Sequence, residues 1–126
     1  MPAGLVLFAH GARDARWAEP FLRLRDRVAL AAPDTRVVLA YLEFMTPELD
    51  AAVAELSAAG CREIALVPVF LGQGGHLRED VPNLLQRVAA RHPECHIRLA
   101  VAAGEDDAVL DAIAAYCLRH LWQLNA

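Results

Sequence analysis

Apolar, strand-like segments alternate with amphipathic, helix-like segments four times along this chain of 126 residues. Residues 4–9 form a continuous apolar run, which is typical of a strand buried on both faces of a parallel sheet. The next segment places apolar residues at helical spacing up to Pro33. Because strict alternation predicts right-handed parallel crossovers, we expect an α/β fold with one doubly wound, mainly parallel, four-stranded sheet and helices on both faces. A single flavodoxin-like domain should span residues 1–126.

Capping and turn residues set the expected bounds of these elements. Asp14 is expected to cap the first helix, and Thr46 to cap the second, with Pro47 at its first helical position. Gly60 should close the second helix, and Pro82 falls near the first turn of the third, where proline is tolerated or produces a kink. We expect strands over residues 4–9, 35–42, 63–70 and 95–101, and helices over residues 14–33, 46–60, 77–92 and 106–124.

The composition argues against several classes of function. A net charge of −4, with twelve scattered arginines and no lysine, provides no basic surface for nucleic acid. The apolar runs are far shorter than the roughly 20 residues of a membrane span, and the N-terminus lacks the basic region of a secretory signal. Three widely spaced cysteines argue against a disulfide framework and a structural zinc site. We expect a cytoplasmic protein with reduced cysteines and with neither nucleic acid nor membrane as a partner.

Ligands of a doubly wound sheet bind beyond the carboxyl ends of its strands. Three side chains that can ligate a metal or accept a proton are expected at that edge: His10 after the first strand, Glu43 after the second and His76 after the third. Two imidazoles and a carboxylate suit a divalent ion such as cobalt, nickel, iron or zinc. The sequence therefore predicts a candidate metal-handling site at this edge.

Each of these residues also has a purely structural interpretation. A histidine at a strand end such as His10 often only hydrogen-bonds a neighbouring loop, and a carboxylate such as that of Glu43 is more often solvated or in a salt bridge than a metal ligand. His76 is placed to cap the third helix, and residues 72–75 could form a backbone nest for phosphate. The glycine spacing, however, matches neither the dinucleotide-binding nor the P-loop motif. The other three histidines are interpreted as ordinary residues: His92, His96 and His120.

Three short motifs follow one another along the predicted strand ends: LFAHGARD over residues 7–14, YLEFMTP over residues 41–47, and VPVFL, GGH and DVP within residues 67–82. They resemble the HGSR, FLE…P and P-x-F-L…G-G-H…D-x-P motifs of the CbiX/SirB-type class II chelatases. The resemblance covers most of residues 5–82, and the rest of the chain adds only the fold. Ala12 stands where the family usually has serine, so any hydroxyl contact from that position to a substrate carboxylate is missing.

The resemblance implies an enzyme, a lyase that inserts a divalent metal into sirohydrochlorin without ATP, in cobalamin or sirohaem biosynthesis. It implies His10 and His76 as the metal-binding and proton-accepting pair, with Glu43 as an assisting acidic residue. Cobalt is the expected metal substrate, with iron and nickel as alternatives, and no nucleotide is expected as a cofactor.

Residues beside the motifs are candidates for contacts to the tetrapyrrole. Sirohydrochlorin carries many carboxylates, which the guanidinium groups of Arg13 and Arg78 are suited to orient, whereas Arg16 is interpreted as a solvated surface residue. Gly74 and Gly75 would let the backbone come close to a flat ring. Because one domain of this size is small beside such a substrate, we expect a homodimer with the cleft at or near the subunit interface.

Two other classes of function remain open from the sequence. A non-catalytic carrier of cobalt or nickel would use the same histidines but would not accelerate the entry of metal into the ring. A phosphate-binding module of flavodoxin type would bind a nucleotide or flavin through residues 72–75, independently of His76.

Overall fold

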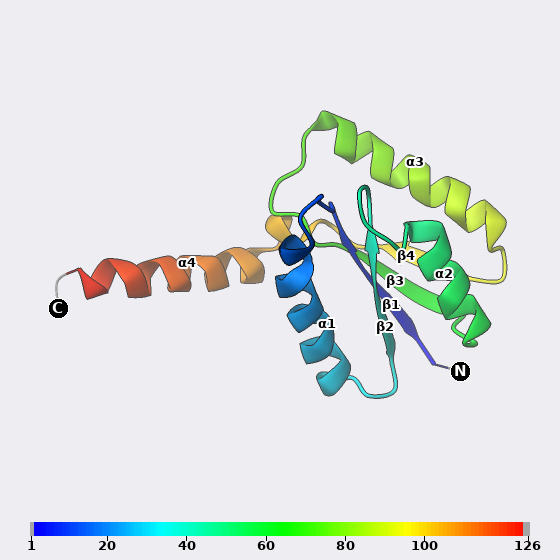
Figure 1. The fold of residues 1–126 in the computed structure, drawn as a ribbon, viewed down its shortest axis with the longest axis horizontal. Helices are drawn as coiled ribbons and strands as arrows, with labels where there is room; N and C mark the ends of the chain where they lie inside the picture. The colour runs from blue at the N-terminus through cyan, green and yellow to red at the C-terminus, as the bar shows by residue number, and fades with distance from the viewer. Residues whose placement is uncertain (1, 125–126) are drawn as a thin grey trace.

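The computed structural model describes residues 2–124 and contains a parallel four-stranded sheet with the strand order β2-β1-β3-β4 (Figure 1). This α/β architecture confirms the predicted fold class. The strands are β1 (Gly4–Ala9), β2 (Arg36–Tyr41), β3 (Glu63–Pro68) and β4 (His96–Leu99). The helices are η1 (Ala15–Ala18), α1 (Glu19–Ala31), α2 (Leu49–Ala58), α3 (Gly75–Arg91), η2 (Ala103–Glu105) and α4 (Asp107–Gln123), of which η1 and η2 are short 3-10 helices.

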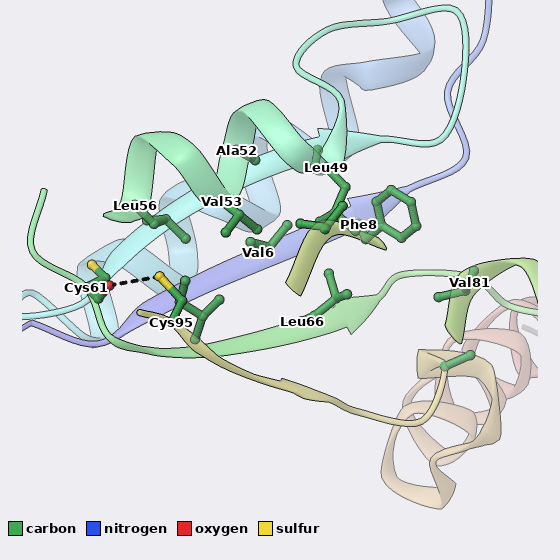
Figure 2. Close-up of a cluster of buried hydrophobic side chains, with 14 of the residues drawn as sticks. Val6, Phe8, Leu49, Ala52, Val53, Leu56, Cys61, Leu66, Val81 and Cys95 are labelled. Carbon is green, nitrogen blue, oxygen red and sulfur yellow. Dashed lines mark hydrogen bonds between the residues drawn. The ribbon is translucent and has the colours of Figure 1, made fainter. Parts of the chain in front are cut away.

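Helices pack against both faces of the sheet, and each face carries its own hydrophobic cluster. Successive residues of a strand point to opposite faces, so Leu7 packs with residues of α1 while its neighbours Val6 and Phe8 belong to the other cluster. Val6 and Phe8 are fully buried, which accounts for the continuous apolar run in β1. The larger cluster lies between the sheet, α2 and α3. Figure 2 shows its side chains between α2 and the sheet. Its most deeply buried members also include Leu49, Val53, Leu56, Leu66 and Val88.

The predicted start of α2 was wrong. Thr46 and Pro47 were expected as the N-cap and the first helical residue, but α2 begins at Leu49 and has Glu48 as its N-cap. The carbonyl oxygen of Pro47 accepts a hydrogen bond of 2.9 Å from the backbone N–H of Tyr41. This contact holds Pro47 against the end of β2, so the helix starts only after it.

Other boundaries also differ from the prediction: β3 ends at Pro68 rather than at residue 70, and β4 spans His96–Leu99 rather than residues 95–101. Asp14 is an N-cap as expected, since its side chain accepts a hydrogen bond from the backbone N–H of Arg16, but the turn that it caps is η1, and α1 begins at Glu19. α3 begins at Gly75 rather than at residue 77. His76 therefore lies in the first turn of α3, and Pro82 lies in the interior of the helix.

α4 does not pack against the sheet. Figure 1 shows this helix leaving the body of the domain beside η2, which is the element that it contacts. None of its residues is buried, and Leu121 and Trp122 are 52% and 62% exposed. On the α1 side of the sheet, Ala65 of the central strand β3 is also exposed. Parallel sheets are normally covered on both faces, so this surface lacks its usual layer.

The cysteines of the described residues carry no disulfide. Cys61 and Cys95 are buried in the larger cluster, and Cys117 is exposed on α4. None of the helices within residues 2–124 combines the length and apolar character needed to cross a membrane.

Candidate active site

The loops that follow β1 and β2 bring His10 and Glu43 together. The Nε2 atom of His10 lies 3.0 Å from the Oε1 atom of Glu43, and both side chains are about half exposed. The backbone supports this pairing, because Glu43 N–H donates to the carbonyl oxygen of His10 over 3.1 Å. An ionised carboxylate only accepts hydrogen bonds, so in this contact Nε2 carries the proton and Nδ1 of a neutral imidazole keeps its lone pair. The pair is thus a proton acceptor or metal ligand with a fixed tautomer.

Gly11 permits the close approach of these two loops. Its φ is +92°, a conformation that side chains disfavour, and a Cβ atom placed there would lie 1.9 Å from the carbonyl oxygen of Glu43. Any other residue at this position would push the loop of Glu43 away from His10. In the sequence, Gly11 stands out only as part of the motif over residues 7–14.

An apolar cavity of about 490 Å³ opens beside His10. Trp17 and Phe21 form one wall, with ring centroids 4.6 Å apart, and Val109 and Ile113 at the start of α4 form another. Trp17 and Phe21 both belong to the segment whose apolar residues recur at helical spacing up to Pro33, a pattern that predicts burial against the sheet. Since α4 leaves the sheet instead of covering it, these side chains border an open cavity.

His76 is separate from the pair formed by His10 and Glu43. It is exposed in the first turn of α3, and no hydrogen bond within residues 2–124 joins it to either residue. The described residues contain no group of three or more histidine, cysteine or acidic side chains arranged to hold a metal ion. The structure thus brings together two of the three predicted residues and leaves the role of His76 as a prediction.

The predicted substrate-contacting residues lie around the same edge. Arg13 is exposed, and its guanidinium carbon lies 4.8 Å from the centroid of the Phe44 ring. Arg78 forms an ion pair with Glu105 over 2.8 Å. Gly74 is the N-cap of α3 and Gly75 its first residue, and a Cβ atom at either position would meet nothing within 4 Å. Packing within the chain therefore does not require glycine at these two positions, and the surface above them is open.

Arg16 is engaged within its own turn. Its guanidinium group donates to both carboxylate oxygens of Asp14, with the shortest contact at 2.7 Å. These hydrogen bonds lower the pKa of Asp14 and raise the pKa of Arg16. The pairing agrees with the interpretation of Arg16 as a surface residue.

Residues 4–118 match the family model described as CbiX, and this range includes every strand and both loops that hold His10 and Glu43. The chain belongs to the CbiX family. Curated relatives of this chain are named sirohydrochlorin cobaltochelatase. The relative from Methanosarcina acetivorans is 32% identical over 82 residues, which are 65% of this chain and 63% of that protein, so the match spans less than two thirds of it. The relative from Saccharolobus solfataricus is 28% identical over 112 residues, covering 84% of this chain and 86% of the relative.

Solved structures of CbiX and SirB proteins have a similar fold. The CbiX protein from Marinobacter aquaeolei VT8 is 34% identical, with a TM-score of 0.86, and the match covers 97% of this chain and 99% of the other. The sirohydrochlorin chelatase SirB from Bacillus subtilis subspecies spizizenii, solved in complex with cobalt, has a TM-score of 0.78 at 22% identity. That match covers 91% of this chain but 49% of SirB, and at this identity it shows the fold alone.

Proposed function

We propose that this CbiX chain is a chelatase of the cytoplasm that inserts a divalent metal ion into sirohydrochlorin without a nucleotide. The observation that carries this proposal is the pair of His10 and Glu43, 3.0 Å apart at the strand ends and beside an apolar cavity. The names of the curated relatives support sirohydrochlorin as the tetrapyrrole and Co²⁺ as the first metal to test, followed by Fe²⁺ and Ni²⁺.

The chemistry of metal insertion suits this pair. The metal must lose water and meet the ring, and two pyrrole N–H protons must leave. With Glu43 fixing the proton on Nε2, the Nδ1 lone pair of His10 is free to bind the incoming ion or to accept a pyrrole proton. Glu43 thus acts as a positioning residue that sets the tautomer and orientation of His10.

His76 is proposed as the second metal-handling residue. It stands exposed at the start of α3, which follows the loop after β3, on the same edge of the sheet as the pair. A ring bound over the strand ends would lie between the loop of His10 and the start of α3. The two histidines would then divide the tasks of holding the ion and accepting protons.

Arg13 and Arg78 are proposed to bind the peripheral carboxylates, and the open backbone at Gly74 and Gly75 to lie close to the ring. Arg78 already pairs with the carboxylate of Glu105, which shows that its guanidinium group can reach an anion at this edge. A substrate carboxylate would replace or join Glu105.

We propose further that the chain works as a homodimer in which α4 of each copy covers the open sheet face of the other. This proposal is supported by two surfaces of the same chain that could pack against each other in a dimer. α4 exposes an apolar stripe at helical spacing, formed by Leu110, Ile113, Cys117 and Leu121, and the face around Ala65 lacks a covering layer. A helix of 17 residues is about 25 Å long, enough to cross several strands spaced about 4.8 Å apart.

A spectrophotometric insertion assay tests the proposed activity. Metal-free sirohydrochlorin is mixed separately with Co²⁺, Fe²⁺ or Ni²⁺, with and without the chain, and the absorption change is followed. The chain should accelerate insertion of at least one metal. Metal binding without any acceleration would contradict the enzyme and favour the carrier.

A further inference from the structure

The loop after β2 contains a strained residue that packing does not explain. Within residues 2–124, Phe44 is the one residue other than glycine with a positive φ, +65°. The N–H of Met45 donates to the carbonyl oxygen of Glu43 over 2.8 Å, so Phe44 is the centre of a three-residue turn of a rare, strained kind. A bulky side chain is disfavoured in this conformation, and glycine or asparagine would adopt it more readily.

The side chain of Phe44 does not compensate for this strain by burial. It is 57% exposed, directly beside Glu43. A large apolar ring is therefore exposed, next in sequence to a residue of the candidate site, in a costly backbone conformation. Strain of this kind is typical of residues held in place for a ligand.

Phe44 is held in place by Arg13, which comes from the loop after β1. The guanidinium carbon lies 4.8 Å from the ring centroid, within the range of a cation–π contact. The same two loops are joined by His10 and Glu43, so two contacts lie side by side between them. Among the described residues Arg13 has no acidic partner, unlike Arg16 and Arg78.

We propose that Phe44 is a substrate-binding residue that stacks on the flat tetrapyrrole while Arg13, held on its ring, pairs with a peripheral carboxylate. This inference rests on the proposed function and adds a residue to it. The turn presents the ring before substrate arrives, so that little side-chain freedom is lost on binding. An aromatic face and a guanidinium group together match a ligand that is flat in its centre and anionic at its edge.

The test uses the full-length chain and compares Phe44→Asn with Phe44→Tyr. Asparagine tolerates the positive φ but removes the ring, whereas tyrosine keeps the ring, so the two separate stacking from backbone strain. The dissociation constant for metal-free sirohydrochlorin is measured by its change in fluorescence, and KM and kcat are measured with Co²⁺. Phe44→Asn should raise the dissociation constant and KM by about tenfold and leave kcat within about twofold, as expected for a contact made equally in the ground and transition states. Phe44→Tyr should bind as the parent does.

Arg13→Gln tests the second half of the contact. It should weaken binding severalfold and remove part of the dependence of binding on ionic strength. Leu30→Asn is the matched control, because Leu30 is an 85% exposed apolar residue near the far end of α1. It should leave binding unchanged.

Three results would overturn the inference while leaving the chelatase assignment intact. The first is normal binding of sirohydrochlorin by Phe44→Asn. The second is a decrease in kcat alone, which would mean that Phe44 acts only through Glu43. The third is a loss of binding that accompanies a change in the number of subunits. Failure of the parent chain to bind sirohydrochlorin would overturn the proposed function, and this inference with it.

Discussion

Glu43 accepts a hydrogen bond from Nε2 of His10, and this contact determines what substitutions at the site should do. Both side chains are about half exposed, so neither contributes much to the core. Their removal should change the chemistry far more than the stability of the fold.

His10→Ala and His76→Ala should each lower the rate of metal insertion by roughly 100-fold to 10,000-fold, as expected for loss of a proton-accepting group. The melting temperature should change little, because both residues are exposed at the sheet edge. Insertion kinetics and circular dichroism of the same samples check this. Near-normal turnover by either folded variant would refute its assigned role.

Glu43→Gln provides the comparison at this site. The amide keeps the shape and removes the charge, so the expected loss is smaller, roughly 10-fold to 100-fold, as for other residues that orient a ligand. Complete loss of insertion would instead make Glu43 an essential base or ligand.

The rate of insertion should fall at acid pH, since protonated imidazoles neither bind metal nor accept protons. Metal and proton compete for the same nitrogen, so raising the Co²⁺ concentration should partly restore the rate. A pH profile measured at two Co²⁺ concentrations tests both statements, and a flat rate from pH 5 to 8 would exclude control by a histidine.

At the scale of the elements, the strand and helix order was predictable because buried parallel strands and capped helices leave strong local patterns. The start of α2 was not predictable, since the contact of Pro47 with Tyr41 joins two segments and leaves no local signal in the sequence. The meeting of His10 with Glu43 followed from topology, as parallel strands end at one edge. The need for glycine at position 11 could not be predicted from topology, because it depends on where the carbonyl oxygen of Glu43 lies in another loop.

Ser57 and Glu94 tie α2 to the turn between α3 and β4, and this tie should depend on pH. The hydroxyl of Ser57 donates to the carboxylate of Glu94, and this hydrogen bond is the main cause that lowers the pKa of Glu94. A lowered pKa in the folded state means that the stabilisation is present above the unfolded pKa, about 4.3, and is lost as the pH falls through the folded value. Ser57→Ala should therefore lower the free energy of unfolding at pH 7 but not at a pH below the folded-state pKa of Glu94.

Thermal melts from pH 2 to 8 measure this difference. Alanine also favours the helix, but that effect is independent of pH. Only the pH-dependent change in melting temperature therefore reports on the hydrogen bond between Ser57 and Glu94. When Glu94 is already replaced by glutamine, the loss of stability caused by Ser57→Ala should not depend on pH. If it does, the carboxylate is not the partner of Ser57.

α4 should be the element that joins two copies. Leu121→Asp places a charge on a helix that is otherwise mainly apolar, and burying that charge against a second copy would be unfavourable. Ala65→Asp should have the same effect from the sheet side. Sedimentation velocity should show a shift from two chains toward one for both variants.

Leu30→Asp is the control for this prediction, because Leu30 is the more exposed leucine and lies on α1. Its mass in solution should equal that of the parent. Loss of pairing by Leu121→Asp but not by Ala65→Asp would mean that α4 contacts the partner elsewhere than on the sheet.

For the whole molecule, activity and assembly should be linked. In one chain the cavity beside His10 is open to solvent, and Val109 and Ile113 of the outlying helix form one of its walls. In the proposed dimer a second copy would close this cavity. Specific activity should therefore fall on dilution together with the fraction of dimer.

Light scattering and the insertion assay at the same concentrations check this link. Full specific activity in a sample shown to be monomeric would contradict the shared cleft and leave each chain as a complete catalyst.

The outlying helix is connected to the body of the chain at Gly104. A Cβ atom at this position would lie 1.6 Å from the carbonyl oxygen of Leu71, and the N–H of Gly104 donates to the carbonyl oxygen of Phe70 over 2.8 Å. No other amino acid fits there without moving the loop that leads to His76. Among related sequences, glycine should therefore be conserved at position 104 although it does no chemistry. A ranking of residues by conservation alone would mistake this point of attachment for part of the catalytic machinery.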